Sequence, residues 1–367
     1  MFNISLKILE KIEQAGFEAY IVGGFARDNY FGRKSTDVDI CTNATPKELK
    51  DIFQGSMLPK EQYGSVAVVY KKIRFDITTY RKDIKYENNR LPVEIEYIDN
   101  LEDDLKRRDF IMNTLCINKE GDYIDLLNAR EDIDRKIIRT VGNAKEKLSE
   151  DSLRILRAIR FATILGFELD DELKQAIIDC GYLLKNLSYY RKKEELDKIF
   201  SSINVKRGIE LLLKFNLYKY LDLNNLEKIV ITSSPLAIWA QLDVLNTYSF
   251  SNIEKYSIET INKLKQNMAF DNYELYTYGL YLTSLVAEIN NIDKSLLTKR
   301  YMNLPIKNKR DISIDGNEIC TILNIKPSSL IKEIIEDLEK KIIHGQLENN
   351  KSIITEYIKK NYSGRVE

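Results

Sequence analysis

The segment that most constrains this chain is YIVGGFARDNYFGRKSTDVDICT, residues 20–42, in which a double glycine and two aspartates accompany apolar strands. On a strand, residues i and i+2 face the same side, with Cα atoms roughly 6.5–7 Å apart. Asp37 and Asp39 therefore present two carboxylates to one point, while Val38 faces the core. Two neighbouring carboxylates repel each other, and a divalent cation relieves that repulsion. Hard oxygen ligands favour Mg²⁺.

The double glycine predicts a phosphate-binding turn. Gly23 and Gly24 precede a short helical segment, so backbone N–H groups can approach a phosphate closely and the helix N-terminus adds positive potential. A phosphate turn within ~15 residues of a carboxylate pair indicates nucleotidyl transfer with two metal ions. Asp76, in the strand-like segment RFDITTY, is the candidate third carboxylate. The alternative is a plain turn followed by a solvated strand end, because DxD alone is a weak signal.

Composition excludes several kinds of chemistry. Lys+Arg and Asp+Glu are equal at 56 each, so a basic surface must be local. The single histidine, His344, lies far in the sequence from all of these motifs, which argues against Ser-His-Asp catalysis and histidine metal sites, and we interpret it as a surface or cap residue. Four widely spaced cysteines without CxxC predict neither a zinc ribbon nor a disulfide framework. With no apolar run long enough for a bilayer, we expect a cytoplasmic protein without a membrane partner.

The pattern changes along the chain from mixed to helical. Residues 1–140 alternate β-rich segments with helices, beginning with a helix that carries Ile8, Leu9, Ile12 and Ala15 at helical spacing. From about Lys145 the pattern is almost continuous helix, with a stop at Gly166 and a break at IKPSSL. The predicted fold class is α+β, with a mixed-sheet head followed by an all-helical remainder.

The segment SEDSLR predicts a protein-side template for a base. Asp151 and Arg154 are i and i+3 on the expected helix and would share a face. The carboxylate accepts from the amine of cytosine or adenine, and the guanidinium donates to the adjacent ring acceptor. Uracil and guanine instead place an acceptor against the carboxylate and a donor against the guanidinium. Each hydrogen bond left unmade costs on the order of 1–3 kcal/mol. The alternative is a charge near a helix start with a surface partner.

Four motifs together carry a resemblance. GGFARD, STDVDICTNATP, DDLKRRDFIMNTL and SEDSLRILRAIRFATILGFELD resemble, in order and spacing, the class II CCA-adding tRNA nucleotidyltransferases, whose near relatives are the bacterial poly(A) polymerases. The likeness covers Tyr20 to about Phe200 and weakens beyond Val205. Family sequences often read RRDFTINA, and this chain departs at Ile111, Met112 and Thr114 while keeping the charged and amide positions.

The resemblance implies four domains and a set of site residues. The domains are a polymerase-β-like head (1–140), a neck with the base template (141–205), and a tRNA-binding body (206–305) and tail (306–367). It places Asp151 and Arg154 in the template. Other implied site residues are Gly23, Gly24, Arg27, Arg107 and Arg108 for phosphates, Asp109 and Asn113 for the ribose, and Arg157 and Arg160 beside the template, with Arg157 the stronger candidate.

Two further groups have supporting roles in this interpretation. Glu150 supports the template, and Arg191 and Glu195 form an i,i+4 pair that buttresses it. The alternative for that pair is a surface contact worth ~0.3–0.5 kcal/mol. The segment YRKDIKYENNRLPVEIEYI is polar and aperiodic, and we expect a mobile loop there. By resemblance, its residues Asp83, Tyr86 and Arg90 help the site change from C to A.

The expected reaction is addition of C, C and A to the 3′ end of tRNA from CTP and ATP, with two Mg²⁺ ions and no protein partner. Poly(A) polymerase is the near alternative, although no long basic extension follows NYSGRVE. A CC-adding enzyme and a catalytically silent RNA-binding module are the others, and the intact DxD argues against the last. The body should bind RNA by shape and backbone. Candidate basic residues are Lys206, Arg207, Lys263, Lys265, Lys307, Lys309 and Arg310.

Overall fold

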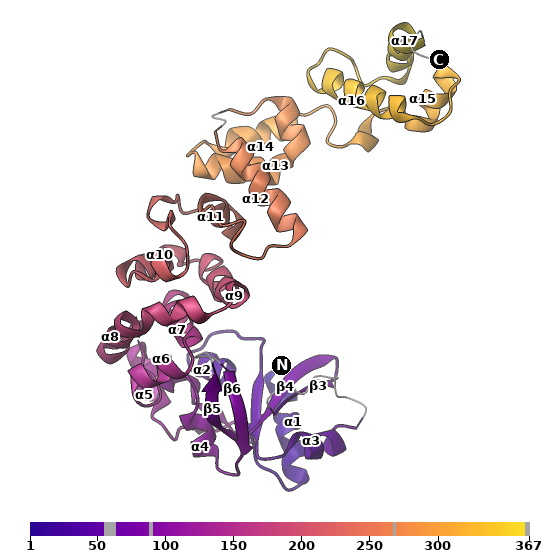
Figure 1. The fold of residues 1–367 in the computed structure, drawn as a ribbon. Helices are drawn as coiled ribbons and strands as arrows, with labels where there is room; N and C mark the ends of the chain where they lie inside the picture. Colours follow the sequence, from indigo (N-terminus) through magenta and orange to yellow (C-terminus); the bar gives the residue numbers. More distant parts are fainter. Residues whose placement is uncertain (55–63, 88–90, 267–268, 364–367) are drawn as a thin grey trace. The chain divides into compact units, whose positions relative to one another are not determined.

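The computed structural model describes residues 1–54, 64–87, 91–266 and 269–363. The chain divides into two compact units (Figure 1). The first comprises Met1–Glu227 and Thr247–Ser249, and the second comprises Lys228–Asn246 and Phe250–Glu367. The first unit contains the sheet and all of the predicted catalytic motifs, so the site can be described within it alone.

The first unit is built on a six-stranded mixed sheet with the order β3-β4-β2-β1-β7-β8. β2 and β4 run parallel, and every other neighbouring pair is antiparallel. This confirms the predicted α+β class with a mixed sheet. The strands are β1 (Ala19–Val22), β2 (Asp39–Thr42), β3 (Ser65–Tyr70), β4 (Ile73–Thr79), β7 (Cys116–Ile117) and β8 (Tyr123–Ile124).

The two faces of this sheet bury different side chains because alternate residues point to opposite sides. One face packs against α1 (Phe2–Gln14) and α3 (Pro46–Ile52) in a core that includes Ile21 and Ile40. The other face, with Val22 and Cys41, packs beneath α4 (Leu101–Lys106). The periodicity predicted for the first helix is confirmed for Ile8, Leu9 and Ile12 of α1, which are fully buried, but Ala15 lies just beyond the end of the helix and is exposed.

The loop predicted after residue 80 is in fact a β-hairpin. β5 (Arg81–Glu87) pairs antiparallel with β6 (Leu91–Tyr97), with register shifts in between. The prediction failed at β5 because RKDIKYE is mostly charged and shows little of the apolar alternation that identifies a strand, whereas VEIEY in β6 does alternate. Asp83 and Tyr86 lie in β5, whereas Arg90 falls outside the described residues.

The rest of the first unit is helical apart from one short strand pair. β9 (Ile137–Ile138) runs parallel to β10 (Glu168–Leu169), an exception to the predicted continuous helix. α7 (Leu153–Leu165) ends just before Gly166, whose φ of +71° confirms the predicted stop. The helices are α2 (Gly24–Tyr30), α5 (Ala129–Arg135), α6 (Ala144–Glu150), α7 (Leu153–Leu165), α8 (Asp171–Cys180), α9 (Tyr189–Phe200) and α10 (Val205–Lys214).

The described part of the second unit contains helices and no strands. The IKPSSL break is confirmed between α15 (Gly316–Leu323) and α16 (Ser329–Ile343). α13 (Asn272–Ile289) is kinked at Gly279, where φ is +73°. Within the described ranges, no helix combines the length and the apolarity needed to cross a membrane. The helices are α11 (Pro235–Gln241), α12 (Asn252–Leu264), α13 (Asn272–Ile289), α14 (Lys294–Met302), α15 (Gly316–Leu323), α16 (Ser329–Ile343) and α17 (Lys351–Tyr362).

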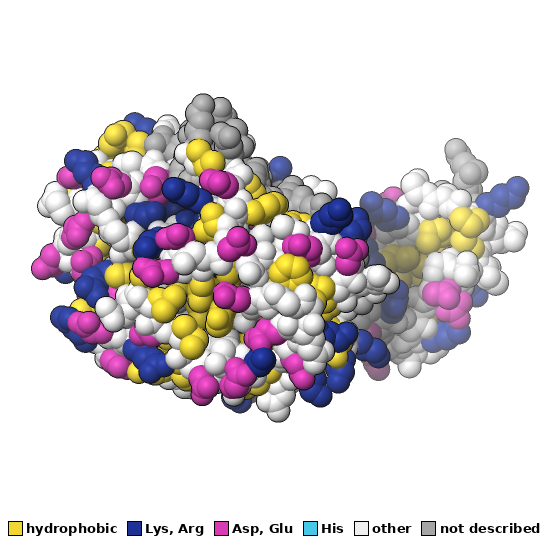
Figure 2. Space-filling view, turned by 90° about the horizontal axis from the view of Figure 1, so that it is seen from below, with side chains coloured by type: hydrophobic (Ala, Val, Ile, Leu, Met, Phe, Trp, Pro, Cys, Tyr) yellow, Lys and Arg dark blue, Asp and Glu magenta, His cyan; other side chains and the backbone are white. Residues whose placement is uncertain are grey.

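The surface mixes both signs of charge. Figure 2 shows Lys and Arg side chains interspersed with Asp and Glu on the face that it presents. This pattern agrees with the equal totals of basic and acidic residues in the sequence.

Candidate active site

The predicted strand, turn and helix around the double glycine are present. β1 ends at Val22, Gly23 adopts φ +77°, and α2 begins at Gly24. Val22 pairs with Asp39 across the strands, so the turn lies beside that carboxylate. A Cβ placed on Gly23 would lie 3.4 Å from Asp39 Oδ2. Glycine therefore meets two demands here: the left-handed backbone and open space next to the carboxylate.

Asp37 and Asp39 alternate with the core as predicted. Asp37 precedes β2 and Asp39 begins it; both are exposed, whereas Val38 is 3% exposed. Desolvation and then repulsion from Asp37 raise the pKa of Asp39 to about 6. Two carboxylates that disfavour each other's charge form a donor set that suits a divalent cation.

Asp76 lies on the neighbouring strand, directly opposite Asp39 in the β2–β4 register. Its Oδ1 accepts hydrogen bonds from Arg74 Nη2 at 2.9 Å and Nε at 3.1 Å. In the part of the chain that the structure describes, no group of three Asp, Glu, His or Cys side chains is arranged to hold a metal ion. The strand placement of Asp76 is confirmed, and its role as third carboxylate remains a prediction.

A buried aspartate that the sequence reasoning missed holds the RRD arginines. Asp104 is fully buried on α4, and its two carboxylate oxygens accept separately, Oδ1 from Arg107 and Oδ2 from Arg108. The sequence carried a signal for this, because Asp104 precedes the two arginines by three and four residues. Arg108 lowers the pKa of Asp39 by its charge, which links it to the carboxylate pair.

Arg107, unlike Arg108, lines a pocket beside α6. It borders a pocket of about 360 Å³ whose wall includes Lys147 and Glu150 from α6. Arg107 thus lines this pocket, whereas Arg108 acts on Asp39. Their adjacent positions in the sequence did not reveal this difference.

Four of the predicted site residues form one hydrogen-bonded chain. Arg27 Nη1 donates to Asn113 Oδ1 at 2.6 Å, and Asn113 Nδ2 donates to Asp109 Oδ1 at 3.1 Å. Arg157 donates to Asp109 Oδ2 through Nε at 2.7 Å and Nη2 at 2.5 Å. The chain connects α2 of the sheet region to α7, across residues far apart in sequence.

The charge on Asp109 is stabilised by this chain. Burial alone would raise its pKa, but Arg157, Asn113 and the Phe110 N–H outweigh burial and lower the pKa to about 2. Asp109 and Asn113, four positions apart in the sequence, do not share one regular helix. Asn113 ends a 3₁₀ helix that begins only at Ile111, and the two side chains meet because the preceding backbone is extended at Phe110.

The expected helical placement of Asp151 is wrong. Asp151 caps the C-terminus of α6 in an extended conformation, and α7 begins at Leu153. Its Oδ1 accepts from the Leu153 N–H at 3.0 Å, so the carboxylate tethers the start of α7. Burial raises the pKa of Asp151 above its ordinary value. An aspartate that precedes a helix can accept from one of the first backbone N–H groups of that helix. Asp151 takes this position, whereas the sequence pattern had predicted it inside the helix.

Arg154 is held firmly by α6 and by the end of α4. Its Nη1 donates to the Lys147 carbonyl and to Glu150 Oε2, both at 2.8 Å, and its Nη2 donates to the Arg107 carbonyl at 3.2 Å. The side chain is only 7% exposed. Glu150 therefore contacts the predicted template arginine directly, as expected of a supporting residue. The template role of the pair remains a prediction.

The predicted Arg191–Glu195 pair does not form. Arg191 pairs with Glu194, and Glu195 instead binds Arg160 at 3.1 Å and Lys198 at 3.2 Å. Glu195 is 4% exposed and faces inward from α9. The packing of α7 against α9 brings Arg160 to it, and this tertiary contact replaces the local i,i+4 pairing.

Arg207, one of the basic residues predicted to contact tRNA, is bound to other groups of the protein. Arg207 donates to the carbonyls of Ala162 and Phe167 and pairs with Glu168. It thereby satisfies carbonyl groups around the end of α7, which have no partner within that helix.

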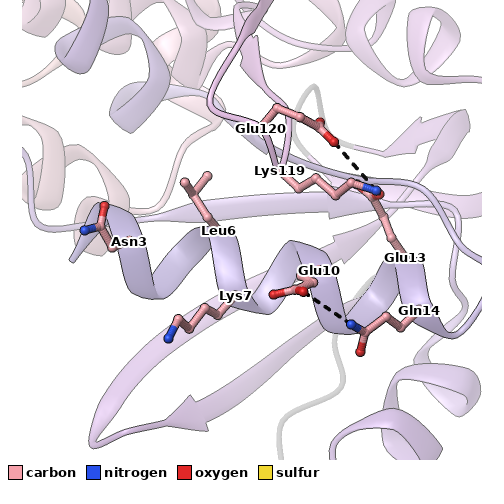
Figure 3. Close-up of a pocket in the computed structure, with 8 residues that line it drawn as sticks. All are labelled: Asn3, Leu6, Lys7, Glu10, Glu13, Gln14, Lys119 and Glu120. Atoms are coloured by element: carbon pink, nitrogen blue, oxygen red, sulfur yellow. Dashed lines mark hydrogen bonds and ion pairs between the residues drawn. The ribbon is translucent and has the colours of Figure 1, made fainter.

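A second pocket lies apart from these residues. It has a volume of about 650 Å³ and runs along α1 (Figure 3). Its wall consists of α1 side chains with Lys119 and Glu120, and none of the predicted site residues lines it. Size alone therefore does not mark the site, and we place it at the carboxylate pair and the glycine turn.

Three family models match successive parts of the chain. The "Poly A polymerase head domain" covers residues 19–139. The "Probable RNA and SrmB- binding site of polymerase A" covers residues 166–225, and "tRNA nucleotidyltransferase domain 2 putative" covers residues 239–358. The first contains the glycine turn and the aspartate pair.

Curated relatives match over almost their whole length. The chain is 32% identical to the CCA-adding enzyme of Geobacillus sp. strain WCH70, over 97% of this chain and 96% of the relative. It is 33% identical to that of Ligilactobacillus salivarius, over 98% and 96%. The crystal structure of the Bacillus stearothermophilus CCA-adding enzyme with CTP superposes with a TM-score of 0.83 at 29% identity, covering 98% and 97%. The chain belongs to the family of CCA-adding enzymes and is a tRNA nucleotidyltransferase.

Proposed function

We propose that this enzyme adds C, C and A in turn to the 3′ end of tRNA, using CTP and ATP at a single site. The relatives that match almost the whole chain are named CCA-adding enzymes, and the similar Bacillus stearothermophilus structure was determined with CTP. The observation that carries the proposal is the position of the Asp39 carboxylate against the Gly23 turn. This arrangement brings a place for phosphate next to a place for metal.

The carboxylate pair fits Mg²⁺. Mg²⁺ keeps several waters and is commonly held by one or two carboxylates together with substrate phosphates, so Asp37 and Asp39 supply a sufficient protein share. Their exposure leaves them accessible to a substrate, and their repulsion favours a bound cation. When bound, two such ions would supply Lewis-acid activation of the tRNA 3′-hydroxyl and neutralise charge on the departing pyrophosphate.

The residues around the pair bind and orient the nucleotide. Backbone N–H groups at Gly23 and Gly24 donate hydrogen bonds to phosphate oxygens at the start of α2. Arg108, fixed by Asp104, adds positive charge beside Asp39. Asp109 and Asn113 are assigned to the ribose of the nucleotide. Asp109 also accepts from Arg157 and Asn113 accepts from Arg27, so both residues keep these arginines in place.

Base selection rests on Asp151 and Arg154. The Leu153 N–H fixes one oxygen of Asp151, and Arg154 is anchored by Glu150 and two backbone carbonyls. Rigid groups suit a template, because a base with the wrong edge then meets an acceptor or donor that cannot rotate away. Cytosine and adenine share the amine-next-to-acceptor edge that this pair complements.

A nucleotide-addition assay tests the proposal. The enzyme is incubated with tRNA that lacks its terminal CCA, with each of the four nucleoside triphosphates singly and with CTP and ATP together, and the 3′ ends are sequenced. CTP alone should give two C residues, and the mixture should complete CCA. An Asp39→Asn variant is the control for metal-dependent chemistry. A long A tail would identify a poly(A) polymerase, and termination after CC would identify a CC-adding enzyme. No addition at all would indicate a catalytically silent RNA-binding protein.

A further inference from the structure

One aromatic ring contacts three arginines of the site. Phe161 lies on α7 and is half-buried. The guanidinium carbons of Arg27, Arg157 and Arg160 lie 5.1, 5.5 and 4.4 Å from the centre of its ring. The ring also packs edge-on against Phe110, with centroids 5.8 Å apart and an interplanar angle of 86°.

Three guanidinium groups around a single ring repel each other, and two kinds of interaction offset this repulsion. Each cation lies within the ~6 Å range at which the negative face of an aromatic ring attracts it, and arginine also stacks well on such faces. Carboxylates pair with the same cations: Asp28 with Arg27, Asp109 with Arg157, and Glu195 with Arg160. The ring is therefore the shared inner contact of the cluster.

The cluster joins two parts of the proposed nucleotide site. Arg27 comes from the helix that follows the glycine turn, on the phosphate side. Arg157 comes from α7, one turn beyond the template arginine. Asn113 and Asp109 link these two arginines by hydrogen bonds, and among the described residues Phe161 is the aromatic side chain that contacts both directly.

We propose that Phe161 is a positioning residue that sets the phosphate-side Arg27 and the base-side Arg157 in one fixed relation, so that the two ends of a nucleoside triphosphate enter the site in a single register. This inference rests on the proposed function. Without the ring, both guanidinium groups lose their common contact and repel each other into a wider range of positions. Binding of CTP and ATP then weakens together, and the base is held less firmly against the template.

The test replaces the ring while keeping an apolar side chain. Phe161→Leu should raise the Kd for CTP and ATP about tenfold, the loss expected for one or two cation–π contacts, with kcat within about threefold. The CTP-to-UTP ratio of kcat/KM should fall and the KM for tRNA should stay unchanged. Phe161→Tyr keeps the aromatic face and should restore both Kd values and the CTP-to-UTP ratio to within about twofold of those of the unmodified enzyme.

A matched control separates positioning from packing. Phe167 is fully buried in the same region and packs edge-on against Phe31. Phe167→Leu should lower the melting temperature without raising the nucleotide Kd. If Phe161→Leu does not fold, Phe161→Met takes its place, because methionine fills irregular space.

Three results would overturn the inference: an unchanged Kd in Phe161→Leu, equal effects of Leu and Tyr, or the same Kd increase in Phe167→Leu. Equilibrium binding of CTP needs no turnover, so this test remains decisive even if the addition assay were to reveal a different RNA product.

Discussion

Asp151→Asn should reverse the preference of the site between cytosine and uracil. Asp151 Oδ1 accepts from the Leu153 N–H, and no partner of Oδ2 is seen among the residues that the structure describes. Asparagine preserves the size and can keep its carbonyl oxygen on Leu153, which leaves its NH₂ group where Oδ2 stood. A donor then replaces the acceptor that is proposed to meet the base.

The magnitude follows from the bonds exchanged. Cytosine loses a hydrogen bond to a charged acceptor, worth about 1.5–3 kcal/mol, and its amine now faces another donor. Uracil gains a neutral hydrogen bond through O4, worth about 0.5–1.5 kcal/mol. The combined change of about 2–4 kcal/mol corresponds to a shift on the order of 10²-fold in the CTP-to-UTP ratio of kcat/KM.

The assay measures single-nucleotide addition to tRNA that lacks CCA, with CTP and with UTP as separate substrates. Asp151→Ala serves as the comparison because it also removes the acceptor for Leu153, at a cost of about 1 kcal/mol in stability. It should relax discrimination without favouring uracil. An unchanged CTP-to-UTP ratio in Asp151→Asn would refute the template reasoning, whatever happens to the absolute rate.

Three further predictions concern other parts of the site. Asp37→Asn and Asp39→Asn should each reduce addition of C and of A by several orders of magnitude in single-turnover assays, and normal C addition by either would disprove a shared metal site. Replacing Asp83 and Arg90 by Ala should spare CC addition and suppress the final A, as read by end sequencing; equal losses would indicate a general clamp. Asp109→Asn should destabilise the fold at pH 7 by about 2 kcal/mol, since the folded pKa of about 2 lies below the ordinary 3.8. That difference should persist above pH 4 and shrink only toward pH 2, and thermal unfolding that shows it gone by pH 5 would contradict the assignment.

Local sequence determined the parts of the site that depend on neighbouring residues. The glycine turn before α2, the core-facing Val38 between Asp37 and Asp39, and the stop of α7 at Gly166 were all predicted correctly. Each follows from the dihedral range of one residue or from the two-residue period of a strand, and neither requires knowledge of distant segments. The order of the four motifs likewise sufficed to indicate the family.

Tertiary structure decided the partner of each charged group. Arg157 binds Asp109, 48 positions away in the sequence, and Glu195 binds Arg160, 35 positions away. The predicted Arg191–Glu195 pair failed because Glu195 faces the buried side of α9, where a desolvated carboxylate requires a cation and α7 supplies one. Sequence spacing cannot reveal such choices. The energy of a buried charge depends on the distance to its counter-charge and on the exclusion of water, and the packing of helices and sheet sets both.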